Sequence, residues 1–390
     1  MSEWKKVKLK DCCIKIGSGS TPKGGSMVYV NSGTSLIRSQ NVYNLSFDYN
    51  GLTHITEDAA NKLKGVTVFN EDILLNITGD SVARTCIVPK EVLPARVNQH
   101  VAIIRTDRKK MNWRFLNYYL ASPKMQAHML SLAVGKGASR NAITKQMIEN
   151  FEVPYPPLST QNRIATILSR YDSLIENYQK QIKLLEEAAQ RLYKEWFVDL
   201  HFPGHENRNI VDGVPEGWEK KKVGDLIAKV PRSKQIPTKD YQKEGIIPII
   251  DQSRDYIAGY TDDIESKVES NEPYIVFGDH TRVLKYVPFA FAKGADGTQL
   301  IMSNNLDLMP QCLLFTSLVS VDLSNYSYAR HFKYLKEEEI LVPTASIANA
   351  FSKHVAKWYA KIQLNREQLR LLTEARDRLL PKLMSGDIEI

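Results

Sequence analysis

Two stretches of the chain carry apolar residues at alternating steps of four and three, the spacing that predicts long helices packed as a coiled coil. In the first stretch the repeating positions are Ile164, Leu168, Tyr171, Ile175, Tyr178, Ile182, Leu185, Ala189, Leu192 and Trp196. In the second stretch they are Phe351, Val355, Trp358, Ile362, Asn365, Leu369, Leu372, Arg376, Leu379 and Leu383. At 1.5 Å per residue, each helix should be about 50 Å long.

Two polar residues, Asn365 and Arg376, interrupt the second stretch. A polar residue in a coiled-coil core fixes register and partner at a cost in stability, so Asn365 is interpreted as a specificity residue. An outward-rotated helix end accounts for Arg376 equally well. The positions expected to form the coiled coil are Ile175, Ile182, Leu185, Leu192, Trp196, Ile362, Leu369, Leu372 and Leu379.

The chain also repeats itself. Residues 175–193 align without gaps on residues 362–380 at an offset of 187, with eight identical pairs. Weaker pairs precede each copy in the same order, namely Asn70-Glu71 with Asn271-Glu272, Asn98-Gln99 with Thr298-Gln299, and Val153-Pro154 with Val342-Pro343. A repeat that keeps its order predicts a duplication, in which a domain and a helix are followed by a second domain and helix.

Each domain is predicted to mix strands and helices. Short apolar runs bounded by Gly, Pro, Asn and Asp are typical of strands, and they occur at 66–69, 73–75, 101–104, 246–250 and 274–277. Residues 112–132 have helical spacing, and Pro123 should kink or split that helix. The predicted fold class is therefore α+β, with a first domain 1–157, a helix 158–198, a linker 199–217, a second domain 218–346 and a C-terminal helix 347–390.

Composition narrows the classes of protein. Apolar residues make up 43% of the 390 residues, which is enough for buried cores in two or three domains. No apolar run approaches 18 residues and the N-terminus is charged, so we expect no membrane span, no secretion and a cytoplasmic location. The four cysteines, Cys12, Cys13, Cys86 and Cys312, are scattered, which argues against disulfides and structural zinc.

The net charge of +8 is distributed unevenly. Residues 1–160 carry 21 basic and 12 acidic residues, a net charge of +9, whereas residues 201–346 carry 17 and 21, a net charge of −4. A surface for a polyanionic partner is therefore expected mainly in the first domain.

The sequence contains segments that resemble catalytic or cofactor-binding motifs, but none of these segments has all the residues that its motif requires. Residues 155–158, Tyr-Pro-Pro-Leu, lack both the polar and the aromatic end of the Asp/Asn-Pro-Pro-aromatic motif of amino-methyltransferases. Residues 17–22 are Gly-rich but end in proline, so they open no helix that could hold a phosphate. His201 and His205 lie in the linker without a third convergent ligand. We expect a binding protein with no catalytic residue, metal site or cofactor of its own.

Polar loops follow corresponding apolar runs in the two domains. Arg or Lys suits guanine and Asn or Gln suits adenine, so the candidates for base reading are Arg38, Gln40, Asp251 and Arg254. The candidates for phosphate contact are Lys136, Arg140, Lys234 and Lys239. A solvated loop explains each residue taken alone, and the repetition is what favours DNA binding. The full candidate set is Lys23, Arg38, Gln40, Asn41, Arg84, Gln99, Lys136, Arg140, Asn141, Arg232, Lys234, Lys239, Asp251, Gln252, Arg254, His280, Arg282 and Gln299.

In the order of its landmarks the whole chain resembles the DNA-specificity (S) subunit of Type I restriction-modification enzymes. The landmarks are Gly-Ser-Gly-Ser-Thr-Pro at 17–22, Pro-Pro-Leu-x-x-Gln-x-x-Ile-Ala at 156–165, Arg-Leu-Tyr-Lys-Glu-Trp-Phe at 191–197 and Gly-Val-Pro-Glu-Gly-Trp at 213–218. One departure is that the second helix opens at 344–349 without the Pro-Pro and Gln of the first.

The resemblance implies a non-catalytic protein with two target recognition domains, each bound to one half of a split site in double-stranded DNA. It also implies that the helices pair as an antiparallel coiled coil that separates the domains and docks two methyltransferase (modification) subunits. A restriction subunit would join them, with S-adenosylmethionine, ATP and Mg in the partner subunits. A 50 Å spacer corresponds to about 15 base pairs, and antiparallel repeated helices relate the domains by a pseudo-two-fold axis.

Two other classes of protein stay open. One is a DNA-modifying enzyme with an unrecognised catalytic motif, which would bind S-adenosylmethionine tightly as an isolated chain. The other is a coiled-coil scaffold for protein interactions, against which salt-dependent binding to duplex DNA would argue.

Overall fold

The computed structural model describes residues 4–134, 142–326 and 330–388, and it divides the chain into two compact units. Unit 1 consists of Met1–Ile175 and Arg370–Ile390, and unit 2 of Glu176–Leu369. The long helix α6 (Leu158–Tyr193) begins in unit 1 and ends in unit 2, whereas α10 (Ala345–Ser385) begins in unit 2 and ends in unit 1. Each unit therefore contains one mixed domain and segments of both helices.

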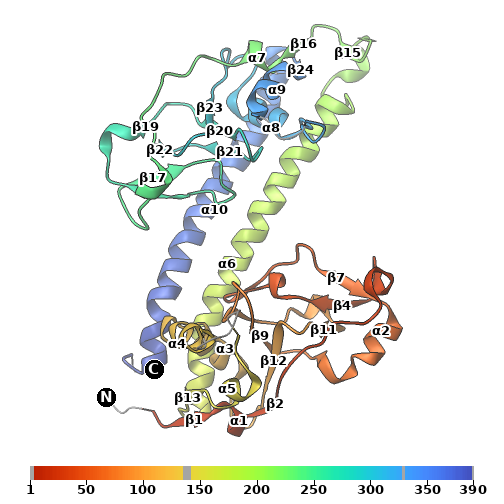
Figure 1. Cartoon of the computed structure of the whole chain (residues 1–390). Helices are drawn as coiled ribbons and strands as arrows, with labels where there is room; N and C mark the ends of the chain where they lie inside the picture. Colours follow the sequence, from red (N-terminus) through yellow and green to blue (C-terminus); the bar gives the residue numbers. More distant parts are fainter. Residues whose placement is uncertain (1–3, 135–141, 327–329, 389–390) are drawn as a thin grey trace. The chain divides into compact units, whose positions relative to one another are not determined.

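Unit 1 is built on two sheets (Figure 1). The first is antiparallel and has the order β10 (Thr85–Ile87), β9 (Ile73–Asn76), β12 (Val101–Thr106), β2 (Cys13–Ser18). The second has the order β3 (Tyr29–Val30), β7 (Thr53–Ile55), β4 (Thr34–Ile37), β11 (Ala95–Val97), β8 (Thr67–Val68), and its β4 and β11 are parallel. A further pair joins β1 (Lys6–Lys8) to β13 (Glu152–Pro154).

Alternation along β9 and β12 places the first sheet between two cores. Leu74 and Ile103 pack with residues of the second sheet, such as Ile37 and Val97, in one core. Ile73 and Ile104, on the opposite face, pack with the helices in another core. This is the division that a period of two produces in a strand buried on both faces.

Unit 2 repeats this plan. One sheet has the order β18 (Gly259–Thr261), β17 (Ile247–Ile250), β22 (Phe291–Lys293), β19 (Lys267–Val268), with β17 and β22 parallel. The other has the order β21 (Leu284–Val287), β20 (Tyr274–Gly278), β23 (Thr298–Ile301). The pair β16 (Glu219–Lys222) and β24 (Glu339–Val342) corresponds to β1 and β13. The predicted duplication and the α+β fold class are thus confirmed.

Shorter helices accompany the sheets of each unit. Unit 1 contains α1 (Leu9–Cys12), α2 (Glu57–Lys62), α3 (Trp113–Ala121), α4 (Pro123–Ala133) and α5 (Lys145–Glu149). Unit 2 contains α7 (Val223–Leu226), α8 (Gln311–Val319) and α9 (His331–Glu337). The helix predicted at 112–132 is split as expected: Pro123 opens α4, and Ser122 before it is extended, as the residue before a proline prefers.

The helices α6 and α10 run antiparallel in each unit. In unit 2, Phe351 packs against Tyr193, and Asn365 further along α10 lies at Gln181, earlier in α6. In unit 1, the core that contains Ile164 and Leu168 also contains Leu380 and Leu383. None of the predicted coiled-coil positions is exposed. The predicted antiparallel coiled coil is therefore confirmed.

Three details change or refine the sequence-based predictions. Arg376 does not mark an outward-rotated helix end, because its side chain is 13% exposed and its Nη1 lies 2.9 Å from Asp172 Oδ1. Helix α6 ends at Tyr193 and continues as a π-helical turn over Lys194–Val198. The predicted linker contains a hairpin of β14 (Ile210–Val211) and β15 (Val214–Pro215).

Candidate nucleic-acid interface

Polar loops of unit 1 meet at one end of its first sheet. We call residues 19–23, 38–41, 77–84 and 98–100 the first loop cluster. The Ser20 amide donates to Val97 O over 3.1 Å, the Asn98 amide donates to Ile37 O over 3.0 Å, and the Thr21 hydroxyl donates to Gln99 Oε1. These bonds bring together segments that are far apart in the sequence.

Glycine is required where two of these segments touch. A Cβ on Gly19 would lie 2.0 Å from the carbonyl oxygen of Val97 and 2.3 Å from that of Asn98. Real side chains essentially never approach a backbone oxygen this closely, so a larger residue would push the segment away. The Gly-Ser-Gly motif thus holds the 19–23 segment against the 98–100 loop.

The predicted residues of the first loop cluster differ in what they contact. Arg38 Nη2 donates to Gly51 O over 2.7 Å, and Gln40 Nε2 donates to the same oxygen over 3.4 Å. Asn41 is fully buried and its amide donates to Asp48 O over 2.9 Å. Gln40 is exposed, whereas the buried Asn41 shapes the loop.

The remaining candidates of unit 1 lie on the same loops. Gln99 is exposed, with its Nε2 3.0 Å from a ring nitrogen of His100. The guanidinium of Arg84 stacks on the ring of Tyr43 at 4.5 Å, and Lys23 is exposed. Lys136, Arg140 and Asn141 lie outside the described residues.

Unit 2 has a corresponding second loop cluster, which we define as residues 251–254, 279–283 and 295–299. Gln252 is at its centre: its Nε2 donates to Asp296 O over 2.9 Å and its Oε1 accepts from the amide of His280 over 3.2 Å. The Asp279 amide donates to Gly297 O over 2.7 Å. These loops follow β17, β20 and β22 at the end equivalent to that of the first loop cluster.

Asp251 lies at the base of this second loop cluster, and its carboxylate accepts hydrogen bonds from residues of its own domain. It is 9% exposed, and it accepts from the Ser253 amide over 2.8 Å, from the Ser253 hydroxyl over 2.6 Å and from the Tyr241 hydroxyl over 3.2 Å. Lys285 Nζ lies 3.8 Å from the same carboxylate and donates to Asp255 O. The geometry gives Asp251 a role in fixing the loop, and base reading by Asp251 stays a prediction.

Lys285 is a buried lysine that sequence reasoning missed. Its side chain is 3% exposed, and burial lowers its pKa to about 8, although the nearby carboxylates of Asp251 and Asp255 favour the charged form. An isolated lysine inside an apolar strand run gives no signal in the sequence. Through Lys285, strand β21 contacts Asp251 and Asp255 and so helps to hold the 251–254 loop.

The other cationic candidates of unit 2 differ in whether they form ion pairs with carboxylates. Lys234 Nζ lies 2.7 Å from Asp263 and 3.4 Å from Glu265, so its charge is already balanced. Arg282 donates to Tyr326 O over 3.0 Å. The exposed candidates without an ion pair among the described residues are Arg232, Lys239 and Arg254. Gln299 is half-buried beside a pocket that also contains Lys293, a residue absent from the predicted set.

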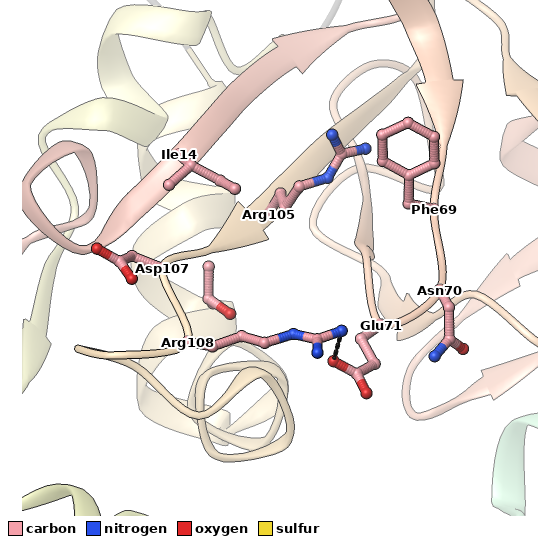
Figure 2. A pocket seen from close by; sticks show the side chains of 8 residues that line it. Ile14, Phe69, Asn70, Glu71, Arg105, Asp107 and Arg108 are labelled. Carbon is pink, nitrogen blue, oxygen red and sulfur yellow. Dashed lines mark ion pairs between the residues drawn. The ribbon is translucent and has the colours of Figure 1, made fainter.

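A second pocket lies at the opposite end of the first sheet of unit 1, and its positive charges are already paired. Its volume is about 280 Å³, and Figure 2 shows Arg108 directed at Glu71, with 2.6 Å between Nη2 and Oε2. Arg105 is paired with Asp72 through two 2.7 Å bonds and stacks on Phe69 at 4.1 Å. Because both guanidinium groups face carboxylates, the pocket offers no free positive charge.

The coiled coil carries polar contacts that the heptad pattern did not predict. Arg376 of α10 pairs with Asp172 of α6, which also accepts from the Tyr118 hydroxyl of α3. Burial and the Asp172 charge raise the pKa of Tyr118. In unit 2, Arg366 pairs with Glu186 at 2.9 Å and stacks on Tyr256 at 3.9 Å. Asp172 thus links α3 to both long helices in unit 1, and Arg366 links Tyr256 to both helices in unit 2.

Within the described ranges, no three His, Cys, Asp or Glu side chains converge as a metal site requires. In the same ranges, no helix is both long and apolar enough to cross a membrane. The sheets, helices and loops described above make the chain a two-domain α+β protein with paired long helices and a cluster of polar loops in each domain.

Comparisons with known proteins agree with this description. Residues 1–187 match the family model of the Type I restriction modification DNA specificity domain. The Type I restriction enzyme MjaIX specificity subunit of Methanocaldococcus jannaschii is 27% identical over 100% of this chain and 94% of its own length. The HindI specificity subunit of Haemophilus influenzae is 21% identical over 100% of both chains.

The fold has a solved counterpart. The crystal structure of a Type-I restriction-modification system S subunit from M. genitalium covers 98% of this chain and 96% of its own, with a TM-score of 0.63 and 15% identity. Residues 1–187 therefore match the Type I restriction modification DNA specificity domain, and the whole chain is similar to specificity subunits of Type I restriction enzymes. These subunits recognise DNA sequence and are non-catalytic.

Proposed function

We propose that this chain reads a two-part sequence in double-stranded DNA, with the first loop cluster bound to one half-site and the second to the other. The observation that carries the proposal is the duplication of the loop clusters: each follows a parallel strand pair and the β9 or β20 hairpin of its own domain. Two similar readers in one chain suit a site with two separate parts.

The exposed side chains of the clusters have the chemistry for base and phosphate contact. Gln40, Gln99 and Arg254 are polar or cationic and reach solvent at loop tips. Amide groups pair with adenine and guanidinium groups with guanine in the major groove. The positive charge of the first domain supports attraction to the DNA backbone.

Two methyltransferase (modification) subunits are the proposed partners on the helices. Leu184 and Leu371 are identical positions of the repeat, at an offset of 187, and they are 54% and 44% exposed. Large apolar side chains exposed at equivalent positions suit two copies of one partner. Replacing Leu184 with Asp should remove one methyltransferase copy, and replacing both leucines should remove both, as native mass spectrometry would show.

The chemistry is proposed to reside in the partners. A restriction subunit would complete the complex, with S-adenosylmethionine, ATP and Mg bound outside this chain, and the complex would act in the cytoplasm. The isolated chain should then show no binding of S-adenosylmethionine by isothermal titration. Tight binding would favour an unrecognised enzyme instead.

Methylation mapping tests the central proposal. Cells that express this chain with its methyltransferase should carry methylated adenine at one split sequence, two short specific parts separated by a fixed number of unspecified bases. A matched strain with the methyltransferase alone should carry none. A single undivided motif would contradict the two-reader proposal.

A further inference from the structure

The two domains differ at one sheet edge. In unit 1, β2 follows α1 and pairs with β12 along five residues, Cys13 and Lys15 to Ser18, as the outer strand of the sheet. In unit 2, the segment after α7 starts the same way, because Ile227 bridges Ser303 and the Ala228 amide donates to Met302 O over 2.8 Å. The pairing then stops, and β23 keeps β20 as its strand neighbour.

Pro231 gives a physical reason for the interruption. It lacks the N–H that a strand at this position would donate, so the chain leaves the sheet edge. The chain returns at Gln235, which bridges Lys293, and the Ile236 amide donates to Lys293 O over 3.0 Å. Residues 229–234 therefore form an arch beside the open edge of β23.

A pocket of about 480 Å³ lies between the arch and the sheet. Its polar lining consists of Arg232, Ser233, Gln235, Lys293 and Gln299, and no carboxylate lines it. Neither Arg232 nor Lys293 forms an ion pair within the described part of the chain. Two positive charges without a lining acid stand out in a domain whose residues 201–346 have a net charge of −4.

Hydrogen bonds hold Gln235 and Lys293 in the lining of the pocket. Gln235, with its amide oriented to suit both neighbours, accepts from Lys293 Nζ over 3.2 Å and donates to Asp296 Oδ1 over 3.2 Å. Ser233 Oγ is buried and has no hydrogen-bond partner among the described residues. Burial lowers the pKa of Lys293, whereas the charge of the nearby Asp296 favours its ammonium form. A buried hydroxyl and a partly desolvated ammonium both gain from an anion.

Lys234 provides a contrast on the same arch. It points to Asp263 and Glu265, which already balance its charge, and it does not line the pocket. Gln299 lies on the pocket wall and belongs to the second loop cluster, so the pocket adjoins the residues that we propose read bases.

We propose that this pocket binds one phosphate group of the DNA backbone at the half-site read by unit 2, an inference that rests on the proposed function. Lys293 supplies a point charge, Arg232 a guanidinium fork, and Ser233 a hydroxyl donor to the phosphate oxygens. The site is specific to the second domain, because β2 fills the corresponding edge in the first. It fixes the register of the second loop cluster on the duplex.

The test removes the charge of one DNA phosphate at a time within the recognition site that methylation mapping identifies. Each phosphate of the second half-site is replaced in turn by a methylphosphonate, and binding to the methyltransferase complex is measured. With the wild-type chain, one position should lose about tenfold in affinity, the size of one charge-assisted hydrogen bond. With Lys293→Gln, affinity for unmodified DNA should fall about tenfold and that position should lose its effect. The salt slope should fall by about 1.

Control variants separate the possible outcomes. Ser233→Ala should give a smaller loss at the same phosphate, whereas Lys243→Gln, an exposed lysine outside the pocket, should leave the scan unchanged. If Lys293→Gln leaves every methylphosphonate effect intact, the pocket proposal is wrong while the proposed function stands. If the wild-type complex shows no preference for any split sequence, the proposed function itself is wrong. Competition by inorganic phosphate at millimolar concentration, without any DNA effect at a single position, would assign the pocket to a free anion instead.

Discussion

At the level of single residues, the loop clusters separate side chains that shape a loop from those that can reach a ligand. Asn41 and Asp251 are buried and fully engaged within their loops, although their residue types suit base reading. Arg254 and Lys239 are exposed. The exposed Arg254 and Lys239 are therefore stronger candidates for DNA contact than the buried Asn41 and Asp251.

Arg254 and Lys239 should give different binding phenotypes. Arg254→Ala should relax specificity at one base pair of the second half-site, at a cost of about 1 to 3 kcal/mol for the preferred base. Lys239→Gln should weaken binding to all sequences alike and lower the salt slope by about 1. Competition binding against every single-base variant of the site, at two salt concentrations, measures both effects. The reverse assignment would contradict the separation of base and phosphate contacts.

Lys285 predicts a particular pH dependence of stability. Its pKa is about 8 in the folded chain, against 10.5 for a lysine side chain in water, so between these values the unfolded chain binds the extra proton. The free energy of unfolding should therefore rise with pH across this window, by about 3 kcal/mol from this residue. Urea unfolding of the wild type and of Lys285→Met, which lacks the titrating group, measures the difference between pH 7.5 and pH 10.5. Parallel pH profiles would show that Lys285 does not titrate in this window.

At the level of secondary-structure elements, the helix pair combines an apolar seam with a few buried polar groups. Asn365 is fully buried; its Nδ2 donates to Gln181 Oε1 over 3.2 Å, and its Oδ1 has no partner among the described residues. A buried acceptor without a donor costs free energy, which agrees with a residue kept for register rather than for stability.

Asn365→Leu should therefore stabilise the chain. We expect the free energy of unfolding to rise by about 1 kcal/mol, because the unsatisfied acceptor is removed. The variant should also form mixed oligomers in light scattering, because the register constraint is lost. Ile362→Ala in the same seam is the comparison, with an expected loss of about 2 to 5 kcal/mol. A destabilised, strictly monodisperse Asn365→Leu would contradict the register role.

Arg376 should matter far more than its neighbour Arg378. Arg376 is 13% exposed and pairs with Asp172, whereas Arg378 is 75% exposed and pairs with Glu374 on its own helix. Removing one partner of a largely buried ion pair leaves the other uncompensated, at a cost of about 3 kcal/mol, while an exposed pair contributes less than about 1 kcal/mol. Thermal unfolding of Arg376→Ala and Arg378→Ala provides the comparison. Equal losses would show that the Asp172 pair is effectively solvated.

At the level of the whole molecule, each domain carries its own cores and its own loop cluster, so recognition should be modular. Replacing residues 1–157 by the first domain of a relative should change one half of the methylated sequence and leave the other half and the spacing unchanged. Replacing residues 218–346 should do the converse. Methylation mapping of both hybrids checks this, and a change in both halves from one exchange would contradict independent reading.

Much of this architecture could be predicted from the sequence, because it depends on periodic patterns. The heptad spacing predicted the helix pair, and the repeated landmarks predicted the duplicated α+β domains. Both signals are local or repeated, and apolar periodicity directly records which face of an element is buried. Proline at 123 likewise predicted the break between α3 and α4, because its ring excludes a continuous helix.

The roles of individual polar residues depended on the tertiary structure. Arg376 interrupts the seam in sequence, yet it is accommodated by Asp172, a residue about two hundred positions away. No sequence pattern singled out Lys293; only the fold shows that it lines a pocket together with Pro231 and Arg232. Side-chain burial and pairing are set by contacts between distant segments, which one sequence does not specify. The sequence alone therefore determined which elements form and repeat, and the tertiary structure decided which of their polar groups form hydrogen bonds inside the protein and which are exposed to solvent.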